Sequence, residues 1–372
     1  MKVLILTVTT GEGHNATAHA LESKLRDNGC ECITLDVCYF VSKLLGFSVS
    51  QGYMLSIDTF SGGYSWLYDH LEKKDNSLGK LAPPRAAFSI IAAKLRSYLE
   101  NFQPDAIVCT HVFAGVPVEF LKAKGHVHCK TFGILTDFTL HPYWDQAAHF
   151  DYLVIPSSRL AWQCRQKGLR SEQLLPFGIP IHQKFLKTVP KAQSRETLGL
   201  LPDKPVVLIM GGSMGYGGIA RQTRSIDRLN KCFQLIVVCG SNTEEYEKLQ
   251  GKCLRHKAVI TGFTDQIPLM MDAADCIVTK PGGITTSEAL SKGLPLILTK
   301  PIPGHEERNM TFLLNSGAAM GVAANCPVEE LIWQFLSDKT MRQSMKAAAK
   351  SLGHADSAKQ LADFIMQLPT QN

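Results

Sequence analysis

The sequence predicts an α/β protein built from two doubly wound domains that face each other across a central cleft. The chain has 372 residues, more than one hydrophobic core usually holds. Apolar runs of strand length alternate with helix-length segments, which is typical of parallel sheets with helices on both faces. The strand, glycine turn and helix that open the chain return after residue 205. We therefore expect a repeated Rossmann-like unit, with ligands beyond the carboxyl ends of its strands.

The first domain is expected over residues 1–182. An apolar run at residues 2–10 predicts a strand, and a glycine turn and a helix follow it. That helix is expected to end at Asn28-Gly29, where glycine supplies the left-handed cap. Further strands are expected at residues 32–37, 106–110, 130–135 and 152–155.

A stretch with several prolines and little periodicity predicts a linker over residues 183–204. The second domain is then expected over residues 205–354. A C-terminal helix at about 355–372 can pack back on the first domain. The strands of the second domain are expected at residues 205–210, 234–239, 258–260, 276–279 and 294–298.

Composition and charge narrow the class of protein. With 45% hydrophobic and 19% charged residues, the chain is neither disordered nor a coiled coil. No apolar run is long enough to span a bilayer or to form a signal peptide, so we expect a protein that starts at Met1 inside the cell. Eleven scattered cysteines without a Cys-x-x-Cys pair indicate reduced thiols. The net charge of +6 favours phosphate ligands or an anionic membrane surface over nucleic acid.

Residues 39–68 are rich in aromatic side chains, with eight in thirty positions. They either pack in a core or form an amphipathic insertion at a lipid interface, where basic residues just downstream would meet anionic head groups. Tyr64 and Trp66 are the membrane-contact candidates within this segment.

The first glycine turn allows three interpretations. Gly11-x-Gly13-x-x-Ala16 matches a dinucleotide fingerprint, and Asp36 follows at the distance of a ribose-binding acid. The turn can equally join a strand to a helix without any cofactor. In the third interpretation, His14 lies at the mouth of the cleft and acts as a general base.

The run Thr279–Leu290 predicts a strand end, a Pro-Gly-Gly turn and a helix. Glycines let a diphosphate reach the N–H groups at the helix N-terminus, where the helix dipole favours negative charge. Glu288 lies within reach of a ribose diol and can accept two hydrogen bonds from it. Thr285-x-x-Glu288 is also an ordinary capping motif. A polar cluster at residues 303–309 follows the next strand and suits the recognition of a sugar.

Five motifs, in this order along the chain, resemble the monogalactosyldiacylglycerol synthase and processive diacylglycerol glucosyltransferase group. That group lies within glycosyltransferase family 28, which includes the N-acetylglucosamine transferase of peptidoglycan lipid synthesis. The resemblance covers nearly the whole chain. The motifs lie at residues 11–14, 136–144, 177–181, 280–288 and 303–309.

The resemblance implies a GT-B fold and an inverting transfer from a UDP-α-sugar to a lipid hydroxyl, with no metal and no cofactor. His14 would be the catalytic base, and Asp137 would orient His14 or the lipid hydroxyl. Residues implied to bind the donor are Gly212, Ser213, Phe263, Pro281, Gly282, Gly283, Thr285, Thr286, Glu288, Glu306 and Asn309. Residues implied to face the acceptor or the membrane are Gly13, His141 and Trp144, together with Tyr64 and Trp66.

The sequence thus predicts a cytoplasmic hexosyltransferase, peripherally associated with the inner face of the cell membrane. Its expected partners are a UDP-sugar, a diacylglycerol-type acceptor and an anionic membrane surface, and no nucleic acid. The donor sugar and the oligomeric state stay open. Alternatives are a polyprenyl acceptor, a UDP-sugar epimerase and a non-catalytic UDP-sugar sensor. A dehydrogenase would leave the turn from Pro281 to Glu288 unexplained.

Overall fold

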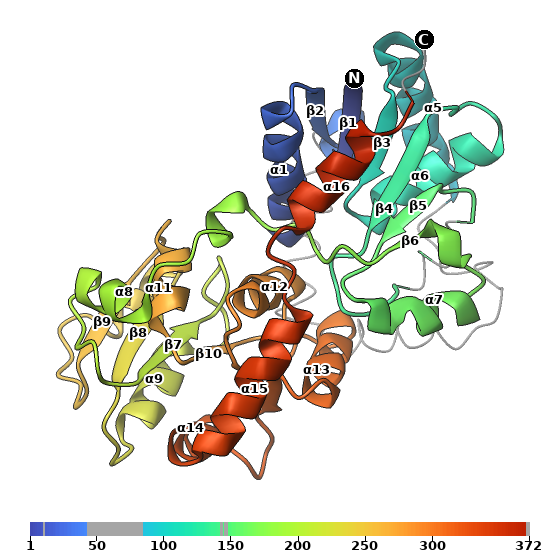
Figure 1. Cartoon of the computed structure of the whole chain (residues 1–372). Helices are drawn as coiled ribbons and strands as arrows, with labels where there is room; N and C mark the ends of the chain where they lie inside the picture. The colour runs from blue at the N-terminus through green and yellow to red at the C-terminus, as the bar shows by residue number, and fades with distance from the viewer. Residues whose placement is uncertain (10–11, 43–84, 142–143, 145–147, 370–372) are drawn as a thin grey trace. The chain divides into compact units, whose positions relative to one another are not determined.

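The computed structural model describes residues 1–9, 12–42, 85–141, 144 and 148–369. The chain forms two compact units (Figure 1). Unit 1 comprises residues 1–183, 303–305 and 356–372, and unit 2 comprises residues 184–302 and 306–355. Tyr64 and Trp66 lie outside the described residues, as does Gly11.

Unit 1 contains a six-stranded sheet in the order β2-β1-β3-β4-β5-β6, in which all neighbouring strands are parallel. The order reverses between β1 and β3, because β2 lies on one side of β1 and all later strands lie on the other. Its strands are β1 (Lys2–Thr7), β2 (Glu31–Asp36), β3 (Ala106–Cys109), β4 (Lys130–Ile134), β5 (Tyr152–Val154) and β6 (Leu174–Leu175).

Helices cover both faces of this sheet, since successive side chains of a strand point to opposite faces. In β1, Val3 and Ile5 belong to a core with α1 and α16, whereas Leu4 and Leu6 pack with α5 and α6. The helices of unit 1 are α1 (Glu12–Asp27), α2 (Val37–Val41), α5 (Arg85–Phe102), α6 (Val112–Ala123), α7 (Ala161–Gln166) and α16 (Ser357–Met366), with 3-10 turns η2 (Ser158–Leu160) and η3 (Ser171–Gln173).

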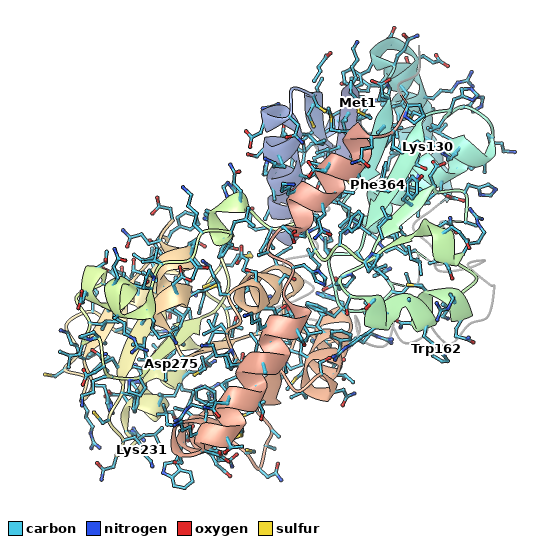
Figure 2. The ribbon with its side chains drawn as sticks, in the orientation of Figure 1. Met1, Lys130, Trp162, Lys231, Asp275 and Phe364 are labelled. Carbon is cyan, nitrogen blue, oxygen red and sulfur yellow. The ribbon has the colours of Figure 1, made fainter. Side chains whose placement is uncertain are left out.

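The C-terminal helix α16 belongs to unit 1 although most of the preceding 170 residues belong to unit 2. It packs against α1 (Figure 1), and its Phe364 ring, labelled in Figure 2, lies 5.0 Å from the Tyr152 ring. Ser357 donates a buried hydrogen bond of 2.8 Å to the carbonyl of Ile179.

Unit 2 repeats the plan with the parallel order β12-β11-β10-β7-β8-β9, which reverses between β7 and β10. Its strands are β7 (Val206–Met210), β8 (Gln234–Val238), β9 (Ala258–Thr261), β10 (Cys276–Thr279), β11 (Leu296–Leu298) and β12 (Ala319–Gly321). Its helices are α8 (Lys191–Thr197), α9 (Ile219–Asp227), α10 (Thr243–Glu247), α11 (Ile267–Ala273), α12 (Gly283–Ser291), α13 (His305–Asn315), α14 (Val328–Ser337) and α15 (Lys339–Leu352). The prediction of two doubly wound α/β domains is confirmed.

The segment at 183–204, expected to be a linker, contributes helix α8 to unit 2. Asp275, labelled in Figure 2, holds this helix against the amino end of β10. Its carboxylate accepts hydrogen bonds from Lys191 (2.8 Å), Arg195 (2.7 Å) and the backbone N–H of Val206 (2.8 Å). The ion pairs of Asp275 at the amino end of β10 therefore stabilise the fold.

Trp144 is a core residue, which corrects its assignment to the acceptor or membrane surface. Its side chain is buried at 4% exposure and packs edge-to-face on Phe150. The ring lies against Gly115 of α6 and Gly133 of β4, where an added Cβ would approach it to 2.8 and 2.7 Å. The two glycines leave the space that the indole fills. Among the described residues, no helix is long and apolar enough to span a bilayer.

Replacing Gly115 with alanine is expected to destabilise the protein by about 1–3 kcal/mol, because the new methyl group overlaps the Trp144 ring. In a Trp144→Leu background the same change should cost less, since the smaller side chain leaves room. The free energy of unfolding in urea, measured for both single variants and the double variant, checks this. An equal cost in both backgrounds would contradict the assigned packing.

Candidate active site

Both sheets place their candidate site residues at the point where strand order reverses. Ligands of open parallel sheets bind there, beyond the carboxyl ends of the strands. In unit 1, the residues after β1 and β3 include His14 and Thr110. In unit 2, the glycine turns at 211–218 and 281–283 follow β7 and β10.

His14 lies in the first turn of α1 and is held by the end of β3. Its Nδ1 lies 2.7 Å from the carbonyl oxygen of Thr110 and 3.2 Å from the Thr136 hydroxyl. A carbonyl only accepts, so Nδ1 carries the hydrogen and Nε2 carries the lone pair. No hydrogen-bond partner of Nε2 is found among the described residues. The ring can therefore accept a proton at Nε2.

His111 packs edge-to-face against His14, with ring centroids 4.3 Å apart. Its Nδ1 accepts the backbone N–H of Phe113 at 3.0 Å and so caps the N-terminus of α6. This assigns the hydrogen of His111 to Nε2 and makes the ring neutral. Burial lowers the pKa of His111 well below its usual range, and the neighbouring His14 adds to that effect. His111 is thus part of the wall against which His14 lies.

Burial also lowers the pKa of His14, while the Thr110 hydrogen bond and the charge of Asp137 oppose that shift. Asp137 is partly buried and follows β4 on the same edge of the sheet. The imidazole is therefore neutral near pH 7 and ready to take up a proton. Gly13 and His141 are also partly buried at this edge.

Asp36 is fully engaged by the backbone, which argues against a dinucleotide cofactor. One carboxylate oxygen caps α2 by accepting the N–H groups of Cys38 and Tyr39 at 2.9 and 3.0 Å. The other accepts the N–H and hydroxyl of Thr9 at 2.7 and 2.6 Å. A ribose diol would have to displace these bonds, so the Asp36 carboxylate is not available to bind one.

The first glycine turn of unit 2 interlocks with the end of β8. A Cβ on Gly215 would lie 2.0 Å from the carbonyl oxygen of Cys239, and one on Gly240 would lie 2.3 Å from that of Ser213. Both glycines also have positive φ angles, of 64° and 60°. The backbone at Gly212 and Ser213 is thereby fixed, with the Ser213 side chain exposed. This arrangement suits a ligand that binds backbone N–H groups.

The second glycine turn starts helix α12 without a side-chain cap at Gly282. The first N–H groups of the helix, from Gly283 to Thr285, have no partner within the helix, and the dipole makes this end positive. Thr286 is buried, and its hydroxyl donates to the Gly282 carbonyl at 2.7 Å. Thr286 therefore shapes the turn, while the open N–H groups can bind a phosphate.

Lys280 is a site residue to which sequence reasoning gave no role. Its ammonium donates to the Glu306 carboxylate at 2.6 Å, and its side chain passes 3.6 Å from the position of a Cβ on Gly212. It thus lies beside both glycine turns. The signal available in the sequence is its place between the strand end Thr279 and the Pro-Gly-Gly turn.

Glu306 and Asn309, implied to contact the donor sugar, are buried at 1% and 0% exposure. The second oxygen of Glu306 accepts the N–H of Ile302 at 2.8 Å. Asn309 donates to the carbonyl of Pro281 at 3.0 Å. In this structure both side chains fix the residues 280–282 in place.

Glu288 and Phe263 lie at the same edge of unit 2. Burial raises the pKa of Glu288 to about 8, with Lys184 opposing the shift. No hydrogen bond to its carboxyl is found in the described part of the chain, so the group can take a ligand. Phe263 follows β9 and is 77% exposed. Groups of three or more side chains suited to a metal ion are not found within the described ranges.

Comparisons with known proteins agree with this geometry. The profile of monogalactosyldiacylglycerol (MGDG) synthase matches residues 14–181, and that of the glycosyltransferase family 28 C-terminal domain matches residues 206–362. A processive diacylglycerol beta-glucosyltransferase of Bacillus licheniformis is 31% identical over 98% of this chain and 94% of its own length. The chain belongs to this family of glycosyltransferases.

Solved structures share the fold of this family member. The crystal structure of Acinetobacter baumannii MurG matches with a TM-score of 0.67 at 15% identity, covering 99% of each chain. A UDP-GlcNAc 2-epimerase from Neisseria meningitidis, bound to UDP-GlcNAc, matches with a TM-score of 0.60 at 15% identity over 99% of this chain and all of that one. The expected GT-B fold is confirmed. Because a transferase and an epimerase share it, the fold alone does not decide the reaction.

UDP binding is expected to release a proton from Glu288. With a pKa of about 8, this carboxyl is mostly protonated at pH 7, whereas a ribose diol donates best to the ionised form. Binding therefore favours ionisation, and affinity should rise about tenfold as the pH is raised from neutrality through 8, then level off. Calorimetry in two buffers of different ionisation enthalpy measures the proton release.

Glu288→Gln is the control for that measurement, because it keeps the ionisation of the nucleotide itself but removes that of the carboxyl. The variant should bind UDP more weakly and with a smaller pH dependence. The same pH dependence in both proteins would exclude Glu288 from the nucleotide site.

Proposed function

We propose that this enzyme transfers a hexose from a UDP-sugar to the hydroxyl of diacylglycerol, with inversion, and so forms a β-glycolipid. The observation that carries the chemistry is the neutral His14 imidazole, whose Nδ1 is bound to the Thr110 carbonyl at 2.7 Å. Its Nε2 is left to accept a proton. The choice of diacylglycerol is supported by the named activity of the Bacillus relative, which matches along 98% of this chain.

Unit 2 would bind the donor. The diphosphate would lie against the N–H groups of Gly212 and Ser213 and against the N-terminus of α12, with Lys280 as the nearby positive charge. Glu288 would accept hydrogen bonds from the ribose diol. Phe263, an exposed ring, can stack on the nucleobase. Glu306 and Asn309 would act by holding Lys280 and Pro281 in position.

Unit 1 would bind the acceptor and supply the base. As the lipid hydroxyl attacks the anomeric carbon, its proton passes to Nε2 of His14, and the bond from that carbon to the UDP oxygen breaks. Attack from the face opposite the departing diphosphate inverts the configuration. Asp137 would stabilise the imidazolium that forms, because its charge raises the pKa of His14. The positive end of α12 and Lys280 would balance the charge of the departing UDP without a metal ion.

We also propose peripheral association with the inner face of the cell membrane, since a lipid acceptor must be reached from the compartment that holds UDP-sugars. Among the described helices none can cross a bilayer.

The proposed reaction is tested by mass analysis of lipid after incubation with diacylglycerol and each of UDP-glucose, UDP-galactose and UDP-N-acetylglucosamine. We expect a β-linked hexosyl diacylglycerol from one donor, with release of UDP. Conversion of a UDP-sugar without any acceptor would instead indicate an epimerase. Binding of UDP-sugar without release of UDP, whether diacylglycerol or a polyprenyl lipid is offered, would indicate a sensor.

His14→Ala is expected to lower kcat by a factor of about 100 to 10,000 and leave UDP binding unchanged. In the unchanged enzyme, kcat at saturating UDP-sugar should fall only below pH 6.5, because burial lowers the pKa of His14 and the neutral form is the active one. His19→Ala is the matched control, since this histidine lies on the same helix with 67% of its side chain exposed. A similar loss in both variants would reject His14 as the base.

A further inference from the structure

A short exposed segment of unit 1 combines a tryptophan with unpaired positive charges. The segment runs from η2 through α7 to the turn that follows, over residues 158–170. Trp162 is 66% exposed, and its side chain points away from the ribbon (Figure 2). We name this the α7 surface, and it consists of Arg159, Trp162, Arg165, Lys167 and Arg170, all of which are exposed.

The α7 surface divides by helix periodicity into a buried and an exposed side. Leu160 and Cys164 are buried and anchor the segment in the core of unit 1. Trp162 and Arg165 lie three residues apart and share the outer side. The core contacts of this segment are thus made by Leu160 and Cys164, and Trp162 is a surface residue.

Charge on this surface is one-sided. None of its four basic side chains forms an ion pair with an acidic side chain in the described part of the chain. The one acidic residue in the neighbouring turn is Glu172. Tryptophan beside arginine and lysine is the combination that favours the boundary between water and anionic lipid, where the indole enters the head-group layer and the cations meet phosphate.

Trp333 of unit 2 is a second exposed tryptophan, but acidic residues lie on its helix. It is 49% exposed, but the ammonium of Lys231 lies over its ring at 5.0 Å. Acidic residues Glu329 and Glu330 lie on the same helix. An anionic surface would be repelled there, so Trp333 is a matched control for Trp162.

The α7 surface follows the carboxyl end of β5, the edge that also carries His14 after β1. Three strand spacings separate β1 from β5 in the sheet order, which corresponds to roughly 15 Å. We propose that the α7 surface binds the anionic head-group layer of a bilayer and thereby brings this edge of unit 1 to the lipid. The proposal rests on the proposed function for its purpose, but lipid binding can be measured without turnover.

The test is sedimentation with vesicles of phosphatidylcholine containing roughly one third phosphatidylglycerol. Trp162→Ala should weaken binding about tenfold. The variant loses the burial of roughly 60 Å² of apolar ring surface in the head-group layer, and burial of that area strengthens binding by about this factor. Arg159→Gln with Arg165→Gln should weaken it about 30-fold, since each basic residue near an anionic surface contributes about a factor of five. Added salt and pure phosphatidylcholine vesicles should weaken binding of the unchanged protein.

Two controls keep the result specific. Trp333→Ala and the double variant Lys346→Gln with Lys350→Gln, on unit 2, should bind vesicles like the unchanged protein. Wild-type binding by the α7 variants, or no vesicle binding by the unchanged protein, would overturn the proposal; in the latter case the surface would serve another partner.

Turnover with a short-chain diacylglycerol in detergent micelles separates this proposal from the proposed function. The α7 variants should keep wild-type turnover there, because the acceptor no longer has to be reached in a charged bilayer. A loss of micellar turnover in these variants equal to their loss of vesicle binding would overturn the docking role. Absence of turnover in the unchanged protein would count against the proposed function, while its vesicle binding would still stand.

Discussion

Parallel pairing of the strands within each sheet is the constraint on which the site depends. It brings the carboxyl ends of all strands to one edge, and the reversal of strand order opens that edge between β1 and β3 and between β7 and β10. His14 and the two glycine turns of unit 2 are delivered to these points by the strands before them. At the opposite edge, Asp275 ties strands and α8 together by ion pairs. The candidate site residues thus lie at the carboxyl ends of the strands, and the stabilising ion pairs of Asp275 lie at the amino end.

Within that frame the two units solve different electrostatic problems. Unit 2 presents an uncapped helix end and Lys280, which suit a diphosphate. Unit 1 presents a partly buried imidazole whose lowered pKa keeps it neutral and able to accept a proton. Within unit 2, Glu306 holds Lys280 in place. Because the Glu306 carboxylate is buried, it does not expose a negative charge to the ligand.

Several side chains that the sequence singles out for function have structural contacts within the fold. Asp36 accepts hydrogen bonds from Thr9 and caps α2, Trp144 fills the space beside two glycines, and Asn309 donates to the Pro281 carbonyl. Trp162 of the α7 surface is the opposite case. It belongs to none of the sequence motifs, and only the structure shows that it is exposed beside unpaired cations.

The sequence by itself determined the repeated α/β plan, the positions of the strands other than β6 and β12, and the places of His14, Glu288 and the glycine turns. These follow from local rules, since apolar runs, glycine turns and helix starts are set by neighbours along the chain. Only the tertiary structure decided the partners of each side chain. The hydrogen bond from His14 to Thr110 joins residues 96 positions apart, and the one from Lys280 to Glu306 spans 26. Tautomer, pKa and burial depend on such distant contacts, which no local pattern specifies.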